Sequence, residues 1–180
     1  GLKHIALQIF KELDPKSHSN CRLVSKEWKD FIDNTKLWWQ QQISLCRTYL
    51  KIIEFQISES AVKKRESVKE FSKALKYVSK EESLATLKML TVFMRDYFFK
   101  FKPTIGYDPD YDYNTPTPLY FAADRNRLDV FQVCARSPMK NMDVDNFYQI
   151  DSGSTSTILV SACIKNQFEV VEFYMNLKGH

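Results

Sequence analysis

The side chains best suited to chemistry in this sequence are its cysteines and histidines. The cysteines are Cys21, Cys46, Cys134 and Cys163, and the histidines are His4, His18 and His180. The cysteines are 25, 88 and 29 positions apart, so no pair has the CxxC spacing of a zinc site or redox couple. The histidines form no HExxH motif. We therefore expect no metal and no cofactor. Each cysteine has apolar neighbours and should be a small buried hydrophobe in a reduced, intracellular protein of the cytoplasm or nucleus.

Residues 102–116 contain alternating oxygen side chains that resemble part of a calcium loop. These side chains are Asp108, Asp110, Asp112 and Asn114. A calcium loop needs Gly at its sixth position and Glu at its twelfth, where this sequence has Tyr113 and Leu119. We therefore interpret the segment as an acidic, tyrosine-rich turn.

Basic residues exceed acidic ones only slightly, 26 against 22, and are dispersed along the chain. The one triplet, Lys63-Lys64-Arg65, has no aromatic neighbour or second basic cluster, so a solvated helix start is favoured over a nucleic-acid or localisation patch. Phosphate-binding glycine loops and the GxSxG motif are missing. These observations favour a binding protein over an enzyme, with neither nucleic acid nor membrane as an expected partner.

The elements that must position any binding residue are expected to be helices. The chain has 180 residues, of which 44% are hydrophobic and only 4 are Gly and 6 Pro. So little turn-forming sequence argues against sandwiches, barrels and propellers and favours helices joined by short loops.

The first forty residues predict three short helices. Leu2, Ile5, Ile9 and Leu13 recur at helical spacing, and Asp14-Pro15 should end this helix. A second helix is expected from about Ser17, and a third around Trp28, with residues 37–39 closing the segment. Three short helices cannot bury this much apolar surface by themselves, so a partner is indicated.

The order of motifs in this segment resembles an F-box, assigned to residues 1–42. The motifs are Ile9-Phe10, Leu13-Asp14-Pro15, Val24-x-x-x-Trp28 and Leu37-Trp38. Two departures are Gly1-Leu2 in place of the usual Leu-Pro start, and His18 where an apolar residue is expected.

This resemblance implies docking onto the Skp-type adaptor of a cullin–RING ubiquitin ligase. The residues that would face the adaptor are Leu2, Ile5, Ile9, Leu13, Pro15, Leu23, Val24, Trp28, Leu37 and Trp38. The alternative is that they form the core of an N-terminal helical cap on the rest of the chain.

Residues 43–100 are expected to form a helical linker. Apolar stripes predict helices over 43–57 and 68–78. Ser79 stands three positions before Glu82, a capping-box pattern that predicts the start of a third helix through Leu90 and Tyr97. Residues 71–90, with Ala74 as the small residue, are a candidate degenerate repeat.

Residues 101–180 contain two copies of one pattern, forty positions apart. Thr117-Pro118-Leu119 and the following residues resemble the ankyrin motif, and the copy begins at Thr157. The long period implies an insertion near residues 141–154. Both copies have Asn, at 126 and 166, where the motif has Gly, so both should adopt positive φ. The alternative is an ordinary helical domain with a chance Thr-Pro-Leu.

The combined resemblance implies an all-α fold: a three-helix F-box, a helical linker and ankyrin-like helix–turn–helix repeats. It further implies a non-catalytic substrate receptor of a ubiquitin ligase, with an ankyrin scaffold that does not direct ubiquitination as the alternative. Aromatic residues near the repeat turns would bind the target protein: Tyr107, Tyr111, Tyr113, Tyr120, Phe147 and Tyr148. The competing interpretation is that these rings pack locally and hold two long loops in place.

Overall fold

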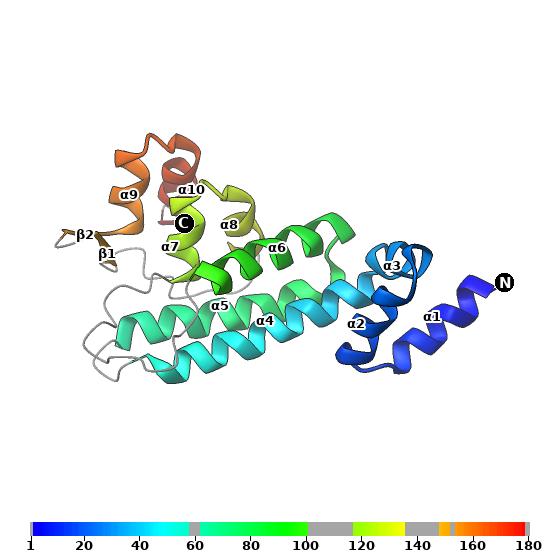
Figure 1. The fold of residues 1–180 in the computed structure, drawn as a ribbon. Helices are drawn as coiled ribbons and strands as arrows, with labels where there is room; N and C mark the ends of the chain where they lie inside the picture. Colours follow the sequence, from blue (N-terminus) through cyan, green and yellow to red (C-terminus); the bar gives the residue numbers. More distant parts are fainter. Residues whose placement is uncertain (1, 58–61, 101–116, 136–147, 152–153, 179–180) are drawn as a thin grey trace.

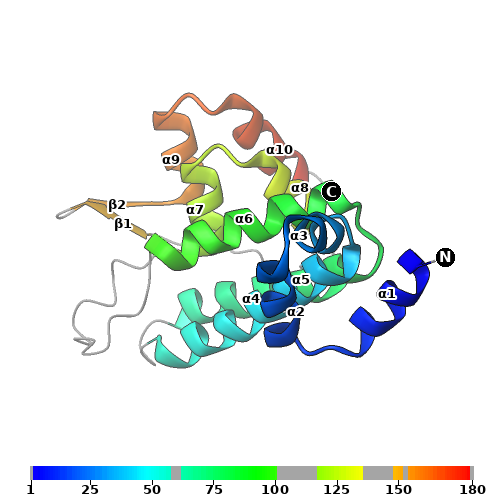
Figure 2. The ribbon, with the colours of Figure 1, turned by 45° about the vertical axis from the view of Figure 1, so that its right-hand side comes forward.

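The computed structural model describes residues 2–57, 62–100, 117–135, 148–151 and 154–178. The fold is all-α, with one small β-hairpin between two of the helices. Helices α1–α3 lie at one end, the long helices α4–α6 form the middle, and α7–α10 lie at the other end (Figure 1). The view in Figure 2, turned from that of Figure 1, again shows α7–α10 along one side of α6. The expected acidic turn, with Tyr107, Tyr111 and Tyr113, lies outside the described residues, as does Phe147.

Three short helices open the chain as predicted: α1 (Leu2–Glu12), α2 (Pro15–Val24) and α3 (Lys26–Asp33). The break between α1 and α2 is at Asp14, whose carboxylate accepts hydrogen bonds from the backbone N–H groups of Lys16 and Ser17 at 2.8 and 3.0 Å. The hydroxyl of Ser17 also donates to this carboxylate and is the main cause of its lowered pKa. Helix α2 begins at Pro15 rather than near Ser17, because proline fits the first position of a helix.

Helix α4 (Lys36–Gln56) is continuous for 21 residues. The tryptophans at 38 and 39 therefore do not close the first segment but lie in the first turn of this long helix. Its buried side chains are Trp38, Ile43, Cys46, Leu50 and Ile53. The boundary expected between residues 42 and 43 falls inside α4, so one helix joins the N-terminal segment to the rest of the molecule.

Helices α5 (Val62–Glu81) and α6 (Leu84–Lys100) pack beside α4. The predicted capping box at Ser79 is wrong, since Ser79 lies within α5. The Oγ of Ser83 accepts a hydrogen bond from the N–H of Thr86 at 3.1 Å and caps α6 instead. Residues 71–90 thus span parts of two long helices.

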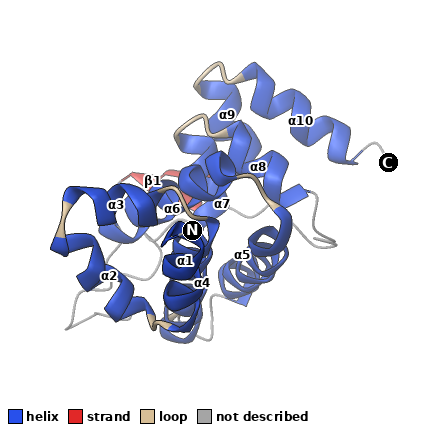
Figure 3. Ribbon diagram, turned by 90° about the vertical axis from the view of Figure 1, so that its right-hand side faces the viewer, coloured by secondary structure: helices blue, strands red, loops and turns tan. Residues whose placement is uncertain are grey.

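Two short helix pairs complete the chain: α7 (Pro118–Asp124) with α8 (Leu128–Ala135), and α9 (Ile158–Ile164) with α10 (Phe168–Lys178). A hairpin of β1 (Tyr148–Asp151) and β2 (Ser154–Ser156) precedes α9. Figure 3 colours these strands red among the blue helices.

Corresponding residues of the two pairs have the same local structure. Thr117 and Thr157 cap α7 and α9 through their side chains. Asn126 and Asn166 have φ angles of 53° and 55°, which confirms the positive φ predicted at both.

One large hydrophobic core extends from α4 to α10, and a small one contains Phe10, Ile32 and Trp38. Trp39 packs against both, so the two cores are connected through its indole. Of the cysteines, Cys46 and Cys134 are buried, and Cys21 is half-buried. Cys163 is exposed, which corrects the expectation that all four are buried.

Candidate adaptor-binding surface

The first three helices expose large apolar side chains to solvent. Ile5 and Ile9 lie on α1, Leu23 and Val24 at the end of α2, and Trp28 in the first turns of α3. Leu23 is 85% exposed, Val24 69% and Trp28 46%. We name these five residues the apolar surface. Large apolar side chains exposed on three consecutive short helices are typical of a protein-binding site.

Four of the other residues predicted to face the adaptor are less accessible than the apolar surface. Leu13, Pro15 and Leu37 are half-buried, and Leu2 begins α1. Trp38 is only 5% exposed, because it belongs to the small core with Phe10 and Ile32. Trp38 therefore supports the helices from inside, which corrects its place in the predicted adaptor-facing set.

Phe10 is the centre of this small core, although from the sequence it was named only as part of the Ile9-Phe10 motif. Its ring centroid lies 5.5 Å from that of Trp28 in an edge-on arrangement, and 5.5 Å from that of Phe31. Trp28 thus rests against Phe10 while leaving nearly half of its surface exposed. The spacing of Ala6, Phe10 and Leu13, which all belong to this core, was the signal that could have identified it.

His18 takes the place of the expected apolar residue and is 1% exposed. Its ring stacks on Phe10, with centroids 5.6 Å apart, and meets Trp38 edge-on at 6.4 Å. Its Nδ1 donates a hydrogen bond to the side-chain oxygen of Gln41, and the Gln41 amide donates to the backbone oxygen of Leu13 at 3.4 Å. The imidazole therefore serves as a flat core side chain, and one hydrogen bond satisfies its donor.

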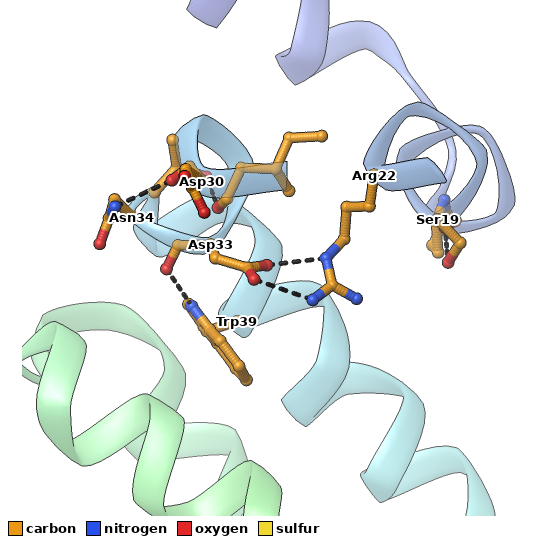
Figure 4. Close-up of polar contacts among 9 residues, drawn as sticks. Ser19, Arg22, Asp30, Asp33, Asn34 and Trp39 are labelled. Atoms are coloured by element: carbon orange, nitrogen blue, oxygen red, sulfur yellow. Dashed lines mark hydrogen bonds and ion pairs between the residues drawn. The ribbon is translucent and has the colours of Figure 1, made fainter. Parts of the chain in front are cut away.

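An ion pair fixes the angle between α2 and α3 (Figure 4). The Nε and Nη2 atoms of Arg22 donate to the two carboxylate oxygens of Asp33 at 2.7 and 2.9 Å. The guanidinium also lies over the Trp38 ring, 4.8 Å from its centroid. The indole N–H of Trp39 donates to the backbone oxygen of Asp33 at 2.8 Å. Asp33 thus joins α2, α3 and α4, and these bonds hold in place the helices that carry Leu23, Val24 and Trp28.

The aromatic residues predicted to bind a target are only partly described. Tyr120 is 4% exposed, and its hydroxyl donates to the Ser161 hydroxyl at 3.4 Å, linking α7 to α9. This ring belongs to the core and offers almost no surface to a partner, a correction to its predicted role. Tyr148 begins strand β1.

The described residues contain no group of three or more His, Cys, Asp or Glu side chains able to hold a metal ion. Among the same residues, no helix combines the length and apolar character needed to span a membrane.

Comparison with known proteins identifies the N-terminal segment. Residues 3–40 match the F-box domain, so the helices that carry the apolar surface are those of an F-box. An F-box domain implies binding of a Skp-type adaptor in a cullin-based ubiquitin ligase. No curated protein and no solved structure matches the chain. The ankyrin resemblance of the C-terminal helix pairs stays a prediction.

Proposed function

We propose that this protein is the substrate-recognition subunit of a Skp–cullin–F-box ubiquitin ligase. The observation that carries the proposal is the exposure of Leu23, Val24 and Trp28 on a segment that matches the F-box domain. Burying such side chains against an adaptor removes apolar area from water, which is the main favourable term in protein association.

The arrangement of the small core supports this docking role. Trp28 is held by Phe10 on one side and is open on the other, so it is already placed for contact. The bidentate Arg22–Asp33 pair orders the helices before any partner arrives. A surface ordered in advance loses less conformational entropy on binding.

The opposite end of the molecule is the part we assign to the target protein. Helices α9 and α10 expose the apolar side chains of Val160, Ile164, Phe168 and Met175, which supports a protein contact there. In this function the chain itself makes and breaks no bond. It raises the effective concentration of the target near the enzyme that carries ubiquitin.

The adaptor half of the proposal is tested by co-purification from cells. The variant Leu23→Ser with Val24→Ser should lose both the adaptor and the cullin, because two exposed apolar contacts are removed without touching the core. The control is Phe55→Ser, which alters an exposed apolar residue near the end of α4. It should retain both partners. Retention of the adaptor by the folded double variant would refute docking through the F-box.

The receptor half is tested by comparing proximity labelling and protein turnover between the intact chain and the same double variant. If the chain is a substrate receptor, some of the proteins that it labels should accumulate in cells when adaptor binding is lost. The alternative, an ankyrin scaffold that binds the adaptor without directing ubiquitination, predicts unchanged turnover of the labelled neighbours.

The tyrosine surface is tested separately by changing Tyr107, Tyr111 and Tyr113 to Ser. Adaptor binding should survive while target capture is lost. If target capture persists, recognition belongs to another surface, of which the exposed side chains of α9 and α10 are the next candidate.

A further inference from the structure

A polar pocket of about 420 Å³ lies between α4 and α5, away from the apolar surface. Its lining is formed by Ser44, Arg47, Thr48, Lys51, Ser72, Lys73 and Lys76. The α4 members recur at helical spacing, so they share one face of that helix, and the α5 members face them. The pocket volume falls in the range of about 300–1,000 Å³ that small-molecule sites occupy.

The lining contains four cationic side chains and no acidic one. Arg47 and Lys51 come from α4, and Lys73 and Lys76 from α5. Lys73 is paired with Glu70 outside the lining, and its side chain remains 58% exposed. The hydrogen bond to Glu70 raises the pKa of Lys73, so this lysine is charged at neutral pH. The carboxylates of Glu70 and Glu54 act on Lys73 from outside the lining. The lining itself supplies only positive charge, which attracts an anion.

Hydroxyl groups lie among these cations. The Nη2 of Arg47 donates to the Ser44 hydroxyl at 3.2 Å, so that hydroxyl accepts there and keeps its own proton for another acceptor. The Thr48 hydroxyl donates to the backbone oxygen of Ser44 at 3.2 Å. Ser72, which also lines the pocket, is buried. Charged donors together with hydroxyls suit a ligand rich in phosphate oxygens.

We propose that this pocket binds a small polyanion with two or more phosphate groups on a polar, hydroxyl-bearing framework of the inositol phosphate type. The lining offers no aromatic or apolar side chain on which a nucleotide base could stack. Arg47, Lys51 and Lys76 line the pocket together with Lys73, whose ammonium is paired with Glu70. This is more positive charge than a single phosphate needs, and the pocket has room for several phosphates. Such a headgroup occurs either free in solution or on a lipid, and both present the same chemistry to the pocket. The proposal does not rest on the adaptor role of the F-box.

The test measures binding to the full chain by calorimetric titration. The probes are inositol hexakisphosphate and inorganic tripolyphosphate, and the salt concentration is about 150 mM, near physiological ionic strength. In the double variant Lys51→Gln with Lys76→Gln, the affinity for both probes should fall by about tenfold or more, because two charge-assisted contacts are lost. Both lysines are exposed, so the fold should be unchanged. The matched control, Lys26→Gln with Lys29→Gln, removes the same charge from exposed positions of α3 and should bind as the unaltered chain does.

Vesicles with and without a phosphoinositide distinguish the source of the headgroup. If the chain binds the free probes but not the phosphoinositide vesicles, the ligand is a soluble one. If the chain binds the vesicles and the Lys51/Lys76 variant does not, the ligand is a lipid headgroup. Either result supports the proposal. Absence of binding to every probe, or equal loss in both double variants, overturns it. Adaptor binding by the Lys51/Lys76 variant should be intact, so failure here is distinguishable from failure of the F-box assignment.

Discussion

Asn126 and Asn166 occupy the same place in two successive helix pairs and have the same left-handed backbone. After α7, the N–H of Arg127 bonds to the backbone oxygen of Ala122 at 2.8 Å, and that of Asn126 to Ala123 at 2.9 Å. The corresponding bonds follow α9. This pattern ends a helix by placing one residue at positive φ, which Asn tolerates better than other non-glycine residues.

We therefore predict opposite effects of two substitutions at Asn126. Asn126→Gly should be neutral or slightly stabilising in chemical denaturation, because Gly adopts positive φ without strain. Asn126→Val should lower the free energy of unfolding by roughly 1–2 kcal/mol, the cost of placing a residue with a Cβ in this region. Equal stability of the two variants would contradict the cap.

The cysteines give a second prediction at this scale, through thiol reactivity. Burial raises the pKa of the Cys46 and Cys134 thiols to about 12. Only the thiolate is nucleophilic. In an assay at about pH 8, below the ordinary thiol pKa, both cysteines should therefore react with a disulfide reagent only after unfolding. The exposed Cys163 should react first, and Cys163→Ser should abolish that fast phase. Rapid labelling of Cys46 or Cys134 in the folded chain would contradict their burial.

Single-residue roles were the hardest to predict from the sequence, because spacing gives the face of a helix but not what covers it. Trp38 and Tyr120 both occur in recognisable motifs, and both are in the core. Cys163 follows Ala162 in α9, and only the packing of α9 shows that one of these neighbours is buried and the other exposed.

Helix α4 is the element that connects the two ends of the molecule. Its N-terminal turn packs with Phe10 and Ile32, and its later turns belong to the large core. The sequence predicted helix from residue 43 but not from residue 36, because residues 37–39 were interpreted as the close of the F-box segment.

The continuity of α4 predicts a strong dependence on position for proline. Gln42→Pro, inside the helix, should cost about 3 kcal/mol or more, because it removes a backbone hydrogen bond and clashes with the preceding turn. Lys36→Pro, at the first position of α4, should be tolerated within about 0.5 kcal/mol. Chemical denaturation of the full chain measures both, and equal effects would contradict one continuous helix.

The ends of the helices show which capping residues could be predicted from the local sequence. Asp14-Pro15 predicted the end of α1, and in the structure Asp14 also caps α2, which begins at Pro15 and not near Ser17 as expected. The sequence predicted a helix start at Ser79, whereas Ser83 caps α6 in the structure. Val78, directly before Ser79, is buried in the large core, and α5 continues to Glu81.

For the molecule as a whole, composition favoured helices, and two copies of one motif, beginning at Thr117 and Thr157, predicted the forty-residue offset between the helix pairs. The pocket between α4 and α5 could not be predicted in this way. Lys51 and Lys76 are far apart in the chain, and the packing of two long helices decides that their faces meet. The same holds for Asp33, whose bonds to Arg22 and Trp39 depend on the angles between three helices.

The most direct test of the central claim is the affinity of the purified chain for a Skp-type adaptor, measured by calorimetry. Trp28→Ala should weaken binding by about thirtyfold or more, since loss of an aromatic anchor commonly costs ~2–4 kcal/mol. Leu23→Ala should also weaken it, and because Leu23 is 85% exposed, its loss leaves the core intact. The control Phe55→Ala should bind as the unaltered chain does. No measurable affinity of the unaltered chain, or unchanged affinity in folded Trp28→Ala and Leu23→Ala variants, would contradict docking through the apolar surface.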